Sequence, residues 1–393
     1  MNETQGYSAE YAALNHEIYN LTRQLEAKEK EYRDSTAADR YDPFKNPTEY
    51  RWYRDDYSEI LPWVTMPEFS VPFEPAKVEK AAIRRFYNIG GLTALFRFIF
   101  SELMAGILST GLTALLTKMN PGASSTAVSH YMTMGAIFVA INMFTFLAVN
   151  VGFAFIGLKW AKIKPSSLLK TRDYHVSDAI MHCLAGLFIW MTSAYISTGI
   201  EDIVSKYGFS TEVLDLDMGK TGLGIAIMTI YSCLIAPITE ELFFRGTLMK
   251  IFSKSNQRFG IVISAVFFGL AHGNLPQFML AFLLGLFLGH IDMRHNSIVP
   301  SVVVHIFINS MVTVIDQFRD NDVIMGLISL GIIVCAIAGL AMLLMFRKES
   351  KFPVSTPAQS RRGIAIAKTS VALIAAVVIQ VIYLVLLIMM TKK

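Results

Sequence analysis

The sequence contains nine apolar stretches that are long enough, or nearly so, to cross a hydrocarbon layer of about 30 Å, which takes about 20 helical residues. Their centres lie near Ser101, Ile141, Phe188, Ile230, Val266, Phe282, His305, Ile333 and Val378. With 53% hydrophobic and 17% charged residues, the chain is too apolar for a soluble protein. The pattern therefore predicts an all-α polytopic membrane protein with about eight to nine transmembrane helices.

The fifth and sixth stretches are separated by very little polar sequence. Residues 259–290 read FGIVISAVFFGLAHGNLPQFMLAFLLGLFLGH and are interrupted only around HGNLPQ. Two crossings joined by a tight turn fit this pattern, and so does a re-entrant pair that enters and leaves on one side. The sequence leaves both arrangements open.

Basic residues alternate between the loops in a way that predicts the orientation. Lys and Arg gather in 159–172, 250–258 and 347–368, with Arg294 between the last two groups, whereas the remaining loops hold few. Because positive charge collects on the cytoplasmic side, we expect the amino terminus in the cytoplasm, with the chain embedded in a bacterial cell membrane. The net charge of +4 then reflects these loops, so no nucleic-acid partner is expected.

Composition divides the chain into three parts. Residues 1–90 form a helical and aromatic cytoplasmic extension, 91–346 a transmembrane core, and 347–393 a basic loop with the last transmembrane helix. The extension has an apolar stripe of helical spacing at Tyr11, Leu14, Ile18, Leu21 and Leu25. We expect this helix to dock on its own protein; substrate capture or a protein partner are further roles for the extension.

The fourth apolar stretch carries charges where a membrane helix normally has none. It ends in PITEELFFRG, and each charge at bilayer depth costs at least about 2.5 to 3.5 kcal/mol. At about 100° per residue, Arg245 lies about 40° from Glu241 and about 140° from Glu240 around the helix. The spacing predicts an ion pair between Glu241 and Arg245 that leaves Glu240 for another use.

Other polar side chains fall at a similar depth. From the cytoplasmic ends of their helices, Glu240 lies about 15 Å deep, His272 about 20 Å, His305 about 12 Å and Asn309 about 18 Å. His305 and Asn309 are four residues apart and share a helix face. A carboxylate, two imidazoles and an amide in a cavity open to cytoplasmic water have the composition of a hydrolytic site.

Each group also has a reading without catalysis. A Glu and Arg pair in a membrane helix can simply hold the fold or relay protons in a transporter, and an intramembrane His can satisfy a core hydrogen bond. A proton-coupled transporter would show inverted repeats, and no internal duplication is visible. The conjunction of four groups at one depth is what favours a hydrolytic site.

The same residues resemble a known family. EELFFRG (residues 240–246), FGLAH (268–272) and HIFIN (305–309) are similar, in order and without substitution, to the three motifs of the CAAX protease and bacteriocin-processing family. Its members are intramembrane endopeptidases that include the type II CAAX prenyl proteases. The resemblance covers roughly residues 220–312, with the motifs in 237–312, and implies hydrolysis of a membrane-associated protein or peptide. A non-catalytic scaffold or bacteriocin-immunity protein of the same fold is the alternative.

The resemblance also implies roles for individual residues. Glu240 activates the attacking water with help from His272, while His305 and Asn309 hold the oxyanion. The remaining motif residues Glu241, Arg245 and Phe268 support this arrangement.

No cofactor is expected to be required. A zinc mechanism with His272, His305 and Glu240 as ligands uses acceptable ligand types, but no HExxH spacing supports it.

Overall fold

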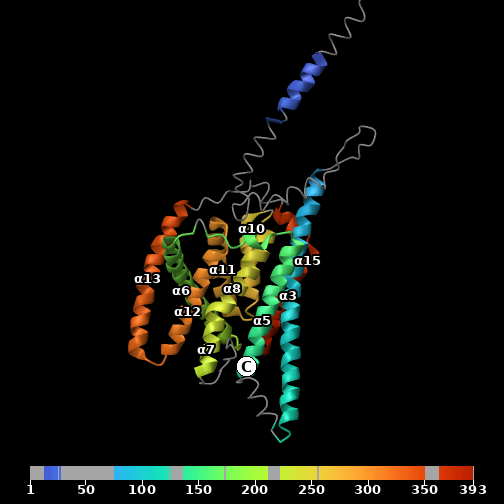
Figure 1. The fold of residues 1–393 in the computed structure, drawn as a ribbon. Helices are drawn as coiled ribbons and strands as arrows, with labels where there is room; N and C mark the ends of the chain where they lie inside the picture. Colours follow the sequence, from blue (N-terminus) through green and yellow to red (C-terminus); the bar gives the residue numbers. More distant parts are fainter. Residues whose placement is uncertain are drawn as a thin grey trace, which may run out of the picture.

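The structure is a computed structural model. All the named secondary-structure elements in the part of the chain that it describes are helices. The described residues are 13–24, 26–27, 75–122, 124, 136–171, 174–210, 222–254, 256–349 and 363–392. The helices and helical turns are α3 (Pro75–Met119), α5 (Ala136–Trp160), η2 (Pro165–Ser167), α6 (Val176–Lys206), α7 (Gly222–Ile230), η3 (Tyr231–Ile235), α8 (Ala236–Glu241), η4 (Leu242–Met249), α9 (Lys250–Phe252), α10 (Gln257–Leu270), α11 (Leu275–His295), α12 (Val299–Phe318), α13 (Asp322–Glu349) and α15 (Val371–Met390). The predicted all-α polytopic fold is confirmed (Figure 1).

Eight of the described helices are long and apolar enough to cross a membrane, and α10 is shorter than the others. Its 14 residues reach only about 21 Å, so the fifth predicted crossing does not have the full length expected of it. The helix ends before Gly273, which has a φ of 69°, and Asn274 then caps α11 by accepting a hydrogen bond from the N–H of Gln277 at 2.8 Å. α10 and α11 therefore form a tight antiparallel hairpin inside the bundle.

The helix that carries the first motif contains two π-helical segments. α7, η3, α8, η4 and α9 follow one another without a break, and η3 and η4 are π turns on either side of α8. Pro237 lies at the start of α8, where it removes one backbone N–H from the helix. π turns inside helices frequently mark functional sites.

This π-containing helix lies in the middle of the bundle. α6 packs against α11, α12 and α13 on one side, while α3 packs against α5 and α15 on the other (Figure 1). The segment η4 contacts α5, α10 and α11. The polar motif residues are thus surrounded by helices rather than by lipid.

The amino-terminal part differs from one expectation. α3 runs without a break from Pro75 to Met119, so the extension leads into the first apolar stretch as one helix. Residues 13–24 are helical, as predicted, but Leu14, Ile18 and Leu21 are each more than half exposed. The expected docking of this stripe on its own protein is therefore wrong for the described residues; Tyr11, Leu25 and the aromatic stretch 41–74 lie outside them.

Gly339 on α13 allows a close contact with α6. A Cβ on Gly339 would overlap the backbone carbonyl of Leu184, whereas a Cβ on Gly331 of the same helix would meet nothing within 4 Å. We expect Gly339→Ala to lower the free energy of unfolding by about 1 to 3 kcal/mol, because the two backbones must separate. Gly331→Ala is the control and should not destabilise the protein. The free energies of unfolding of the two variants would be measured at a fixed concentration of one mild detergent. An equal loss of stability in both would contradict the prediction.

Candidate active site

The first and third motifs meet around one buried imidazole. Nη1 of Arg245 lies 3.0 Å from Oε1 of Glu241, and Nδ1 of His305 lies 2.8 Å from the same oxygen. Nε2 of His305 lies 3.9 Å from Oε2 of Glu240, which is too long for a hydrogen bond. The predicted ion pair between Glu241 and Arg245 is confirmed, and its carboxylate also holds His305.

The two neighbouring carboxylates have different surroundings. The side chains of Glu241 and Arg245 are both fully buried, whereas that of Glu240 is 21% exposed. Since a carboxylate accepts hydrogen bonds, Nδ1 of His305 is the donor toward Glu241. This bond fixes the orientation of the ring and directs Nε2 toward Glu240.

Phe268, from the second motif, is in contact with Arg245 and with both imidazoles. The guanidinium of Arg245 lies 4.2 Å from the centre of its ring, a cation–π distance. The rings of His272 and His305 meet it edge-on with centroids at 5.1 and 5.7 Å. The three motifs are thus brought together in space.

His272 lies in the turn that ends α10. Its Nδ1 is 2.8 Å from the carbonyl oxygen of Phe268, so Nδ1 donates this bond and Nε2 carries the lone pair of the neutral ring. The side chain lines a cavity of about 440 Å³. A basic nitrogen therefore faces the cavity next to the buried motif residues.

Asn309 makes a contact that the sequence did not indicate. Its Nδ2 donates to the carbonyl oxygen of Ser232 at 2.8 Å. In an α-helix the N–H of Ala236 would donate to the Ser232 carbonyl, but in this π turn it donates to the carbonyl of Tyr231. In a π-helix the donor would be residue 237, which is a proline and has no N–H. The Ser232 carbonyl therefore has no backbone donor at either position. Asn309 supplies the missing donor, and one N–H of its amide remains for other use.

Removing this amide should reduce stability. We expect Asn309→Ala to lower the free energy of unfolding by about 1 to 3 kcal/mol, because the Ser232 carbonyl loses its donor. Gln317→Ala, at an exposed position on the same helix, serves as the control. An Asn309→Ala protein that unfolds like the wild type would show that the bond to Ser232 does not stabilise the π turn.

Arg97 on α3 is a site residue that the motifs did not indicate. It is 5% exposed, its Nε donates to Oδ1 of Asn150 at 3.0 Å, and its guanidinium lies 5.6 Å from the ring centre of Phe244. It lines the same cavity as His272 and interacts electrostatically with Glu240. In the sequence, the charge of Arg97 inside the first apolar stretch could have marked it as a candidate site residue.

Asp292 on α11 is a second such residue. It is fully buried, and its Oδ1 accepts a hydrogen bond from the N–H of Ser301 at 2.9 Å. Its charge interacts with those of Glu241 and Arg245. It extends the buried polar network toward the amino end of α12.

The cavity beside His272 extends toward the carboxyl ends of α6 and α15. Val204 and Thr391, at the carboxyl ends of α6 and α15, are part of its lining. With the predicted orientation these ends face away from the cytoplasm. If the predicted orientation holds, this cavity lies on the outer side of His272, and the opening to cytoplasmic water stays a prediction.

Each of the two imidazoles is held by a protein group through Nδ1, which leaves Nε2 as its second ring nitrogen. Nδ1 of His305 bonds to Glu241, and Nδ1 of His272 bonds to a backbone carbonyl. Within the described ranges, no group of three or more His, Cys, Asp or Glu side chains is arranged to hold a metal ion. The zinc alternative therefore draws no support from the geometry.

Comparison with known proteins agrees with the motifs. Residues 222–311 match the family model described as type II CAAX prenyl endopeptidase Rce1-like. A curated protein of Bacillus subtilis (strain 168), "Putative membrane peptidase YdiL", is 28% identical over 141 residues. That alignment covers 35% of this chain and 56% of the relative, so it spans about half of the relative's length. No solved structure matches the chain.

The matched segment contains all three motifs, whereas Arg97 lies outside it. The family match and the curated relative together confirm, over residues 222–311, the resemblance of this chain to the CAAX protease and bacteriocin-processing family.

Proposed function

We propose that the protein is an intramembrane endopeptidase that hydrolyses a peptide bond of a membrane-associated protein or peptide with a water activated by Glu240. The observation that carries the proposal is the contrast between the two adjacent carboxylates. Glu241 is buried and bonded to Arg245 and His305, while Glu240 is partly exposed beside them. A carboxylate near water with fixed neighbours suits a general base.

The neighbouring groups support the later steps of hydrolysis. Glu240 takes a proton from water as the water attacks the carbonyl carbon, and the lone pair on Nε2 of His272 helps to orient that water. When His305 carries both protons, its Nε2–H donates to the oxyanion, together with the remaining N–H of Asn309. The proton on Glu240 then goes to the leaving amine.

Glu241, Arg245 and Phe268 act by holding this geometry. Glu241 fixes the His305 ring, Arg245 neutralises Glu241, and Phe268 stacks against Arg245. Arg97 places positive charge near Glu240. No step of this mechanism requires a metal.

A non-catalytic scaffold is the second candidate, and one observation favours it. Of the motif residues, Glu241, Arg245, His272, His305 and Asn309 all make contacts that hold the fold. Such contacts would be kept in a protein that only binds a partner. Glu240 is the residue that distinguishes the two candidates, because its side chain is partly exposed and lies 3.9 Å from His305, too far for a hydrogen bond.

Comparing the termini of membrane proteins separates the two candidates. Cells that carry the wild-type chain, Glu240→Gln or the exposed control Asp202→Asn would be compared by mass spectrometry of new amino and carboxyl termini. A protease predicts termini that are present with the wild type and Asp202→Asn and absent with Glu240→Gln. Identical sets of termini in all three would contradict the proposal.

A further inference from the structure

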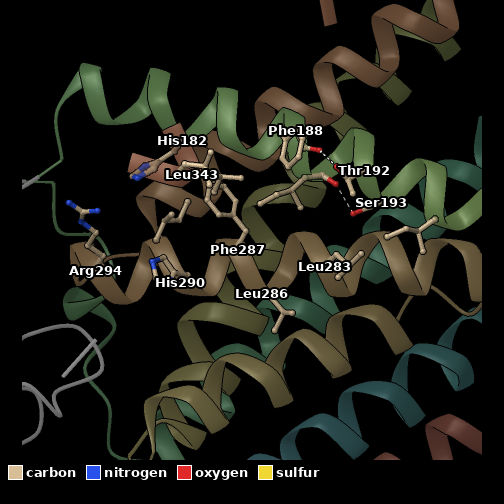
Figure 2. Close-up of a pocket in the computed structure, with 14 residues that line it drawn as sticks. His182, Phe188, Thr192, Ser193, Leu283, Leu286, Phe287, His290, Arg294 and Leu343 are labelled. Carbon is tan, nitrogen blue, oxygen red and sulfur yellow. Dashed lines mark hydrogen bonds between the residues drawn. The ribbon is translucent and has the colours of Figure 1, made fainter. Parts of the chain in front are cut away.

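A second cavity lies on the side of the bundle formed by α6 and α13, away from α3 and α15. It has a volume of about 620 Å³ and is enclosed by α6, α11 and α13 (Figure 2). None of the motif residues lines it. Ile196 and Leu344, which do line it, are 41% and 58% exposed, so the cavity reaches the outer surface of the bundle where lipid would lie.

The walls of this cavity are apolar along most of its length. Phe188, Ile189, Leu283, Leu286 and Phe287 provide the larger side chains. The two hydroxyls in the wall are already used, because Thr192 and Ser193 donate to backbone carbonyls of their own helix at 2.8 and 2.7 Å. This part of the cavity therefore suits a hydrocarbon chain.

One end of the cavity is basic. His182, His290 and Arg294 lie together there, while Ser193 and Leu283 lie toward the other end (Figure 2). No Asp or Glu is among the residues that line it. Asp178, which influences His182, accepts a hydrogen bond from the N–H of His175 at the start of α6. Arg294 supplies the positive charge of this end, and the two imidazoles beside it are hydrogen-bonding groups, so the end suits an anionic group.

The dimensions match one leaflet of a bilayer. From His182 to Ile196 along α6 is about 21 Å, and from Leu283 to Arg294 along α11 is about 16 Å. Half of a hydrocarbon core of about 30 Å is about 15 Å. The basic end lies at the start of α6 and the end of α11, next to the basic loop 159–172, where a lipid headgroup of that leaflet would lie.

We propose that this cavity binds a phospholipid with an anionic headgroup, which lies against Arg294, His290 and His182 while one acyl chain runs between α6 and α11. The proposal does not depend on the protease reaction, because the cavity and the motif residues are separate. It assigns to α13 the role of covering a bound lipid.

Native mass spectrometry of the full-length protein in a mild detergent tests the headgroup. The probes are phosphatidylglycerol, phosphatidylcholine with the same chains, and oleate. We expect phosphatidylglycerol to bind more tightly than phosphatidylcholine, and Arg294→Gln to weaken that binding about fivefold. Lys159→Gln, an exposed basic residue on the same side, should leave it unchanged.

Filling the cavity tests the acyl chain. Leu283→Trp should reduce binding of phosphatidylglycerol, whereas Leu330→Trp, at a 60% exposed position on α13, should not. If Leu283→Trp does not fold, Leu286→Trp fills the same space. Equal binding of the two phospholipids, or full binding by Arg294→Gln, would overturn the proposal. Tighter binding of oleate than of phosphatidylglycerol would identify a free fatty acid instead and would overturn it as well.

Discussion

Replacing Arg245 by alanine is expected to lower the free energy of unfolding by about 3 to 5 kcal/mol. Arg245 and Glu241 are fully buried and 3.0 Å apart, so the substitution leaves the Glu241 carboxylate in the interior without a full positive charge beside it. It also removes the guanidinium that lies 4.2 Å from the ring centre of Phe268. Unfolding by heat or by a denaturing detergent, at a fixed concentration of mild detergent, measures the loss.

Two further variants make this prediction specific. Arg258→Ala removes an exposed arginine at the start of α10 and should change stability by less than about 0.5 kcal/mol. The double variant Glu241→Gln with Arg245→Met removes both charges and should recover part of the loss, because no buried charge remains unpaired. An Arg245→Ala protein as stable as Arg258→Ala would show that the buried pair does not hold the fold.

Replacing Glu240 by glutamine is expected to abolish cleavage with little loss of stability. Glutamine keeps the shape of the side chain but does not take a proton from water, and loss of a general base typically costs about 10² to 10⁴ in rate. The side chain is 21% exposed and 3.9 Å from His305, so no buried bond is broken. Cleavage would be measured in reconstituted vesicles with a substrate identified from the comparison of termini.

The control is Asp202→Asn, an exposed carboxylate near the end of α6. It should cleave at the wild-type rate. Cleavage by Glu240→Gln within threefold of the wild-type rate would remove Glu240 from the reaction, even if the protein is otherwise a protease.

The sequence predicted the parts of the site that depend on regular helix geometry. The spacing of Glu241 and Arg245 predicted their ion pair, and the similar depths of Glu240, His272 and His305 predicted that these side chains would lie near one another. Helical rise and rotation per residue are nearly constant, so such estimates need no tertiary information. The number of apolar stretches predicted the class of fold for the same reason.

The sequence could not predict what depends on departures from that geometry. The two π turns change the hydrogen-bond pattern around Pro237, and only this change leaves the Ser232 carbonyl for Asn309. His305 was expected to hold the oxyanion, and the sequence did not indicate that its Nδ1 would bond to Glu241. Arg97 comes from a helix far away in sequence, and spacing within one helix says nothing about which distant helix packs against it.

The orientation in the membrane, the bacterial cell membrane as location, a protein partner for residues 1–90, the peptide substrate and the independence from metal remain predictions. The position of the cavity beside His272 gives a way to test the orientation in the membrane. Since Val204 and Thr391 line it, labelling of a cysteine at Thr391 from one side of the membrane would show which side the cavity faces.

A density map of the protein in lipid nanodiscs tests the central claim most directly. Our account predicts His305 between the two carboxylates, with Nδ1 about 2.8 Å from Glu241 and Nε2 about 3.9 Å from Glu240, and His272 against the same Phe268 ring. A map in which Glu240 or His305 points toward the acyl chains, away from the other motif residues, would contradict it.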